Sequence, residues 1–176
     1  MATKTQVQVL YIAYFGRPAD PDGLAFWTNG VVGTNEELDQ LADSFADTPE
    51  YLATIQGLRT EQIVDLFYQN LFSRFADQEG QDFWVDGITS GVLNPQDIGV
   101  DIGLAALDQD PPNSDTEAIA AKADAANKIS KALELNPIGN IAYSRIRGIK
   151  VVREYLEAVI DADTIPSDAD VANSIN

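Results

Sequence analysis

Cationic side chains gather in one segment of an otherwise acidic chain. The protein has a net charge of −17, with 28 Asp and Glu against 11 Lys and Arg. Residues 122–153 reverse this balance with seven basic and two acidic residues. Guanidinium and ammonium groups bind phosphates and carboxylates, so this segment carries the candidate ligand-binding residues. They are Lys128, Lys131, Arg145, Arg147, Lys150 and Arg153.

Two interpretations of these cations stay open. They either dock internally against the acidic remainder of the chain, or they form an exposed anion-binding face. Arg145 and Arg147 are two residues apart and cannot share one face of a helix. One of these two arginines is therefore expected to pair internally.

Acidic side chains raise the question of a calcium site. The stretches DPDG at 20–23 and DQEG at 77–80 superficially resemble calcium loops. In an EF-hand loop the glycine comes two positions later and a bidentate Glu ends the loop, so Asp20 and Asp77 are better explained as helix N-caps. We expect no cofactor, and calcium is the alternative for these acids.

Catalysis by the common triads is excluded by composition. The chain has neither Cys nor His, so it has no Ser-His or Cys-His pair and no thiolate. It also lacks a glycine-rich phosphate loop and a dinucleotide fingerprint. Two carboxylates could serve a glycosidase, but every acidic helical protein offers such pairs. We expect no enzyme, and a carbohydrate-active enzyme or its accessory unit is the alternative.

A doubled stretch organises the elements that would position these groups. Sliding the sequence by 57 positions lays residues 11–30 on residues 68–87 with nine identities. Each copy follows an apolar stripe at helical spacing and then places a cap and a glycine before an aromatic pair. The residues that build this corner are Tyr11, Arg17, Asp20, Gly23 and Trp27, and in the second copy Tyr68, Arg74, Asp77, Gly80 and Trp84.

The spacing of the doubled stretch predicts its contacts. The glycines let the preceding aromatic helix approach closely, and the arginines reach the cap carboxylates across the turn. Phe26-Trp27 and Phe83-Trp84 complete the buried face, with both Trp side chains largely buried. The alternative is that Tyr and Trp form a sugar-stacking platform.

Helical patterns cover almost the whole chain, so the predicted fold class is all-α. We expect two helical repeats with a period of about 57 residues, followed by a C-terminal helical hairpin. The repeats occupy 1–110 (copies 7–56 and 64–107), and the hairpin occupies 114–176. The helices predicted with both ends are 5–15, 21–31, 49–57, 60–72, 78–89 and 141–160. Three more are predicted from their starts: one from the Thr34 capping box, one capped by Ser114 and one capped by Ser167. A further helix has Ile98, Ile102 and Ala105 inward.

The doubled stretch resembles the DUF4214 family of helical repeats, which occur mostly in large bacterial secreted and cell-surface proteins. Thr48-Pro49-Glu50-Tyr51 and Asn127-Lys128-Ile129 match further segments of that family. The second copy departs from the family pattern at Ser73 and Gln81. The resemblance covers about residues 7–135.

The resemblance implies a cell-surface module, such as the N-terminal anchoring domain of a larger secreted or S-layer-like protein. Its expected partners are envelope polysaccharide or lipopolysaccharide, the rest of a larger surface protein, and other subunits of a surface layer. The net charge disfavours nucleic acid, and no apolar run is long enough for a transmembrane segment. The first residues lack a signal peptide's features, so we expect an extracellular protein secreted without an N-terminal signal peptide.

Overall fold

The computed structural model describes residues 2–30, 33–136, 140, 143 and 146–174, with the side chains of 146, 147 and 174 left out. These residues are helical and contain no strand, which confirms the all-α fold class. The α-helices are α1 (Lys4–Phe15), α2 (Pro21–Gly30), α3 (Asn35–Ala46), α4 (Pro49–Ile55), α5 (Thr60–Phe72), α6 (Gln78–Thr89), α7 (Ile98–Leu107), α8 (Ser114–Leu135), α10 (Ile146–Glu157) and α11 (Asp168–Ser174), with a 3₁₀ turn at Ala162–Thr164.

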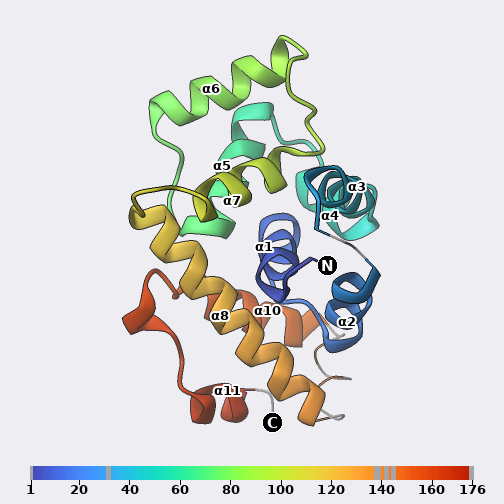
Figure 1. The fold of residues 1–176 in the computed structure, drawn as a ribbon, viewed down its shortest axis with the longest axis vertical. Helices are drawn as coiled ribbons and strands as arrows, with labels where there is room; N and C mark the ends of the chain where they lie inside the picture. Colours follow the sequence, from blue (N-terminus) through green and yellow to red (C-terminus); the bar gives the residue numbers. More distant parts are fainter. Residues whose placement is uncertain (1, 31–32, 137–139, 141–142, 144–145, 175–176) are drawn as a thin grey trace.

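Helix α1 lies at the centre of the molecule and is covered on all sides (Figure 1). Its residues from Val7 to Phe15 are all buried. Helices α5, α7 and α8 pack around it, and the long α8 crosses both α1 and α5. The predicted stripe of α5 is also entirely buried: Val64, Phe67, Tyr68, Leu71 and Phe72. One core therefore joins the two copies of the doubled stretch.

The predicted helix N-caps are confirmed, except that the N-cap of α8 lies one residue earlier. Thr34 forms the expected capping box with Glu37, and Thr48 caps α4. Ser167 accepts a hydrogen bond from the Asp170 N–H at the start of α11. Helix α8 has Asn113 as its N-cap, whereas we had assigned Ser114; the Asn carboxamide oxygen accepts two backbone N–H groups. This is a correction of one residue.

The burial predictions are wrong for the two aromatic pairs and for Ala105. Phe26 and Phe83 are 65% and 61% exposed, and each Trp beside them is half-buried instead of largely buried. In each copy the Phe and Trp rings lie edge to face, and the Trp packs partly against the core, which leaves the Phe in solvent. The predicted inward residue Ala105 is also exposed, whereas Ile98 and Ile102 are buried.

The two long aromatic helices end in the same way. Gly16 and Ser73, 57 residues apart, both adopt the left-handed conformation, with φ of 61° and 56°. Glycine adopts this conformation without strain, whereas a residue with a Cβ does not. The Ser73 hydroxyl donates a hydrogen bond to the Glu157 carbonyl at 2.9 Å, which ties the end of α5 to the end of α10.

Ser73→Gly and Ser73→Ala separate the backbone strain from the hydrogen bond. Both variants lose the bond to Glu157, but only alanine keeps the strain of a positive φ. We expect the Gly variant to be more stable than the Ala variant by about 1 kcal/mol, measured by urea unfolding. Equal stability of the two variants would mean that the end of α5 relaxes out of the left-handed conformation.

The predicted boundary near residues 110–114 falls in the connection between α7 and α8. Helix α8 packs against α1, α2, α5 and α7, and α10 and α11 pack against α8. The part of the chain after residue 114 is therefore joined to the helices before it mainly through the long α8, and α10 adds direct contacts to the ends of α1 and α5. Superposition of residues 7–56 on 64–107 stays a prediction.

Candidate anion-binding site

The motif residues Asp20, Gly23 and Tyr11 build a helix start. The Gly23 N–H donates to Asp20 Oδ1 at 2.8 Å, and the Gly80 N–H donates to Asp77 Oδ1 at the same distance. A Cβ on Gly23 would lie 2.3 Å from the Tyr11 hydroxyl oxygen, and one on Gly80 would lie 2.8 Å from that of Tyr68. The predicted caps and the predicted close approach are both observed.

Replacing Asp20 or Asp77 with Ala should lower the free energy of unfolding by roughly 0.5–2 kcal/mol, because each carboxylate satisfies an orphan N–H. Added calcium should leave the melting temperature of these variants and of the wild type equally unaffected. A calcium-dependent rise in the wild type that either Ala variant loses would assign these acids to a metal instead of a cap.

The motif arginines pair with residues that the sequence pattern did not indicate. Arg17 forms a two-pronged pair with Glu50 of α4, with Nε–Oε1 at 2.9 Å and Nη2–Oε2 at 2.8 Å. Arg74 pairs in the same way with Asp115 of α8. We had expected the cap carboxylates Asp20 and Asp77 as partners, and this is wrong. Both actual partners are the second residue of the helix they belong to, where a carboxylate also faces the positive helix end.

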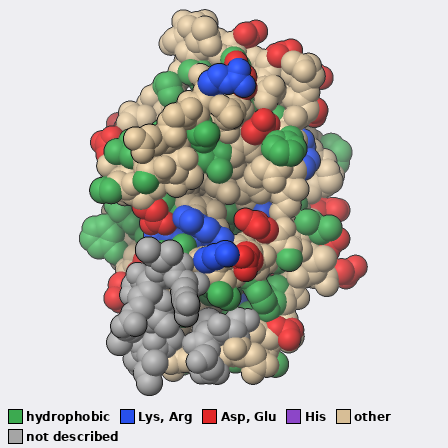
Figure 2. Space-filling view, turned by 180° about the vertical axis from the view of Figure 1, so that it is seen from behind, with side chains coloured by type: hydrophobic (Ala, Val, Ile, Leu, Met, Phe, Trp, Pro, Cys, Tyr) green, Lys and Arg blue, Asp and Glu red, His purple; other side chains and the backbone are tan. Residues whose placement is uncertain are grey.

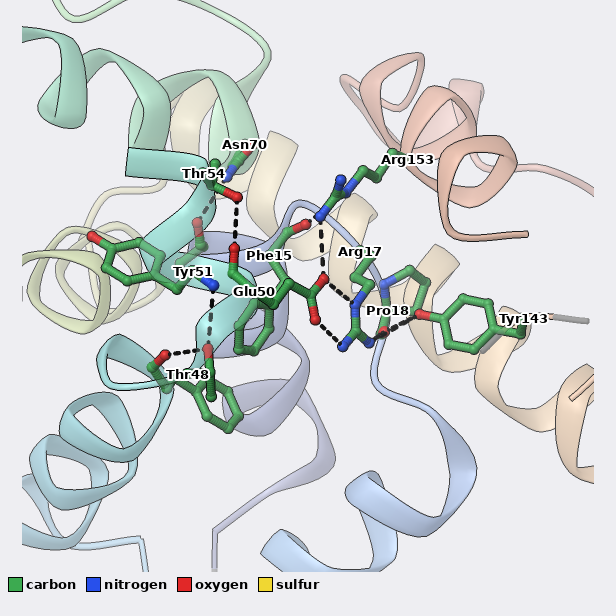
Figure 3. Close-up of polar contacts among 12 residues, drawn as sticks. Phe15, Arg17, Pro18, Thr48, Glu50, Tyr51, Thr54, Asn70, Tyr143 and Arg153 are labelled. Carbon is green, nitrogen blue, oxygen red and sulfur yellow. Dashed lines mark hydrogen bonds and ion pairs between the residues drawn. The ribbon is translucent and has the colours of Figure 1, made fainter. Parts of the chain in front are cut away.

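Arg17 and Glu50 belong to a larger polar cluster (Figure 3). Arg153 of α10 donates to the Phe15 carbonyl at 2.8 Å and to Glu50 Oε1 at 3.2 Å. The Tyr143 hydroxyl donates to the Pro18 carbonyl. Burial alone would raise the pKa of Glu50, but the hydrogen bonds and charge of Arg17, with the charge of Arg153, hold it below its ordinary value. The cluster thus ties α10 to the end of α1.

The other candidate cations are distributed over two helices. On α8, Lys128 lies 3.9 Å from Asp124 and Lys131 is exposed. On α10, Lys150 lies 3.5 Å from Glu154 with three quarters of its side chain exposed, and Arg153 is held by Glu50. Arg145 and the side chain of Arg147 lie outside the described residues.

Structure places these cations in different surroundings. Lys128 and Lys131 line a groove between α8 and α11, and Lys131 also lines a groove between α8 and α2. Seen from behind, Lys and Arg side chains in the middle of the molecule interleave with Asp and Glu side chains (Figure 2). No pocket found in the described part of the chain is lined by candidate cations of both helices.

Lys122, from the same basic segment, docks internally. Its side chain is buried, and Nζ donates to the Asn70 carbonyl at 2.7 Å at the end of α5. Burial lowers the pKa of Lys122 to about 8. Lys122 and Arg153 therefore fit the interpretation of internal docking, whereas Lys131 and Lys150 are exposed and Lys128 is partly exposed.

Comparison with known families gives a match over the middle of the chain. Residues 42–102 match the model of DUF4214, a domain of unknown function. Over these residues the chain is similar to the DUF4214 family. No curated protein sequence and no solved structure gave a significant match.

The DUF4214 match begins within α3 and ends within α7. It includes Arg74, Asp77, Gly80 and Trp84, so the copy that departs from the family pattern at Ser73 and Gln81 is the matched one. The first doubled stretch, residues 11–30, and the cations of residues 122–153 lie outside the match. Among helices of the described residues, none combines the length and hydropathy needed to cross a bilayer.

Carboxylates of α3 and α7 meet at the edge of the DUF4214 region. Asp39 and Asp43 come from α3, and Asp97 and Asp101 from α7. Asp43 and Asp97 each bury one carboxylate oxygen that has no hydrogen-bond partner in the described part of the chain. Burial raises the pKa of Asp39, and the charges of Asp43 and Glu36 add to it; the pKa values of Asp97 and Asp101 are raised too, first by burial.

Asp39→Asn should stabilise the protein at pH 7. A raised pKa means that the folded state holds protons more tightly, so this group makes stability fall as pH rises through that pKa. The gain should be about 0.2–0.5 kcal/mol for each like-charge pair removed, and it should shrink as pH falls to 3. Thermal melts at both pH values measure it, with Asp82→Asn on α6 as the control. A gain independent of pH would contradict the charge argument.

Several residues whose hydrogen bonds support the fold were not identified from the sequence pattern. Gln8 is buried on α1, donates to Ser130 Oγ at 2.8 Å and accepts from the Ala19 N–H at 2.9 Å. Asp65, 57 residues later, accepts from the Ala76 N–H at 3.3 Å. Because Gln8 and Asp65 differ in type, the comparison of identities could not reveal the shared role. A search for polar residues inside an apolar stripe would have found them.

Proposed function

We propose that the chain is a non-catalytic module of a larger secreted or S-layer-like surface protein, which it holds to an anionic polysaccharide or lipopolysaccharide of a bacterial envelope. The exposed cations of residues 122–153 carry this proposal. In a protein with a net charge of −17, Lys128, Lys131 and Lys150 remain at the surface instead of docking against the acidic helices.

The contacts of the doubled motif support a non-catalytic role. Arg17 and Arg74 form ion pairs, and Asp20 and Asp77 cap the N-termini of helices. A pocket near Arg17 contains Asp20, Asp22 and Glu50, but Glu50 is held by two arginines. A carboxylate with a lowered pKa in such a cluster is poorly suited to act as a general acid.

The experiment is co-sedimentation with envelope fragments of the producing organism, prepared with and without their surface polysaccharide. We expect sedimentation only with the polysaccharide-bearing fragments, weakening as salt shortens the Debye length from roughly 10 Å at 0.1 M towards 3 Å at 1 M. Equal sedimentation with both preparations would refute the proposal.

A charge-matched pair of variants tests which cations act. Lys128→Gln plus Lys150→Gln and the single change Arg59→Glu alter the net charge by the same amount. Arg59 is an exposed cation at the start of α5, remote in sequence from the basic segment. The first variant should sediment less and the second should not; equal losses would reduce the effect to overall charge.

A further inference from the structure

A groove of about 600 Å³ lies between α2 and α8, beside the amino end of α1. Helix α2 contributes Leu24, Thr28 and Asn29 to it, and α8 contributes Asn127 and Lys131. Figure 1 shows α2 beside the C-terminal half of α8, with the chain's N-terminus nearby. The volume falls within the ordinary range for small-molecule sites, about 300–1,000 Å³.

Two free cations converge on this groove. Of the cationic side chains that the structure describes, Lys4, Arg59 and Lys131 take part in no ion pair and no buried hydrogen bond, and Lys4 and Lys131 both line the groove. Lys4 is also the first residue of α1, where the peptide dipoles favour an anion. The groove is thus locally cationic on a strongly acidic protein.

Neutral and acidic polar groups complete the lining. Asn29 and Asn127 offer carboxamides, and Glu134 offers a carboxylate. Asn127 Oδ1 is shielded from solvent and has no hydrogen-bond partner within the described ranges. Because the terminal amide torsion of Asn is soft, a hydroxyl group bound in the groove could supply the donor that this oxygen lacks.

We propose that the α2–α8 groove binds an acidic sugar residue, with Lys4 and Lys131 holding its carboxylate or phosphate and Asn29, Asn127 and Glu134 its hydroxyls. The inference rests on the proposed glycan-binding function and names the site and the sugar class. Glu134 disfavours a bare anion through like-charge repulsion, yet it accepts well from hydroxyl groups. A ligand that is both anionic and rich in hydroxyls satisfies the whole lining.

The test titrates the protein with three acidic saccharides: trigalacturonate, sialyllactose and glucose 1-phosphate. Maltotriose is the neutral control and inorganic phosphate the bare anion. Calorimetry gives the affinity, and amide chemical shifts locate the site. We expect at least one acidic saccharide to bind with shifts at α2 and α8. The carboxylate and phosphate arms distinguish the two sources of charge.

Two variants with the same charge change locate the contact. Lys131→Gln should weaken binding about tenfold, as expected for loss of one charge-assisted hydrogen bond. Arg59→Gln, at the start of α5 and outside the groove lining, should change it less than about twofold. Circular dichroism confirms that both variants fold.

Four results would overturn the groove proposal: none of the acidic saccharides binds, maltotriose binds equally well, inorganic phosphate binds as tightly as the saccharides, or Arg59→Gln weakens binding as much as Lys131→Gln. Polysaccharide-dependent sedimentation that is unchanged in Lys131→Gln would leave the glycan function standing and remove this groove from it. Saccharide binding in the groove without sedimentation would do the reverse.

Discussion

Replacing Glu50 with glutamine is expected to lower the free energy of unfolding by about 2–4 kcal/mol. The change leaves Arg17, whose side chain is only 12% exposed, with its charge but without its carboxylate. Breaking a fully buried pair costs about 3–5 kcal/mol, and the partial exposure of Glu50 reduces that figure. Arg153 loses its partner at the same time. Urea unfolding at pH 7 measures the effect.

The equivalent ion pair of the second copy provides the control. Arg74 is 38% exposed, so Asp115→Asn should cost less than about 1 kcal/mol. Because the pKa of Glu50 is lowered in the folded state, its contribution is present above the ordinary Glu pKa and is lost as pH falls through the folded value. The wild type and Glu50→Gln should therefore converge in acid. Equal costs for Glu50→Gln and Asp115→Asn would contradict the role of burial.

Phe67→Ala is expected to lower the free energy of unfolding by about 3–5 kcal/mol. Phe67 is fully buried on α5 and contacts the rings of Tyr14 and Tyr51, at centroid distances of 5.4 and 6.2 Å. A Cβ on Gly99 of α7 would lie 2.6 Å from the Phe67 ring. This tight contact among α1, α4, α5 and α7 leaves little room for collapse around a cavity.

Phe83→Ala removes the same side chain from the surface of α6 and should change stability by less than about 0.5 kcal/mol. Chemical denaturation of both variants, analysed with the same dependence of the free energy of unfolding on denaturant concentration, compares their stabilities. A similar cost for Phe67→Ala and Phe83→Ala would mean that α6 packs more closely than its exposed Phe83 indicates.

Local rules predicted the helices and their inner faces well. The stripes of α1 and α5 follow from the 3.6-residue period alone. The Thr34 and Thr48 caps depend on residues a few positions apart. Each of these features is fixed within one or two turns of chain, so the sequence contains what is needed to infer it.

Contacts between distant segments were beyond those rules. Arg17 and Glu50 are 33 residues apart, and Arg74 and Asp115 are 41 apart, whereas the cap carboxylates were nearer in sequence. The exposure of Phe26 and Phe83 depends on which helices cover α2 and α6. The candidate cations lie in different surroundings because α10 is placed so that Arg153 points towards Glu50.

Gln81 shows how the surrounding helices determine which type of residue is favourable at a position. Its counterpart Leu24 is buried and lines the α2–α8 groove. Helix α6 packs mainly on α5, and none of its residues is fully buried. Position 81 is only partly buried, so an apolar side chain there would gain less from burial than Leu24 does. The departure from the family pattern thus has a physical reason.

The central place of α1 also governs the order in which the chain can fold. Gln8 of α1 bonds Ser130 of α8 across 122 residues, and a helix without its partners has little stability of its own. On the ribosome α1 therefore keeps part of its apolar surface uncovered until α8 has been synthesised, even when α5 and α7 are already present. Closing a loop of this length is slow compared with local contacts. The segment from α1 to α7 thus stays incompletely folded during that interval, in which it is open to chaperones.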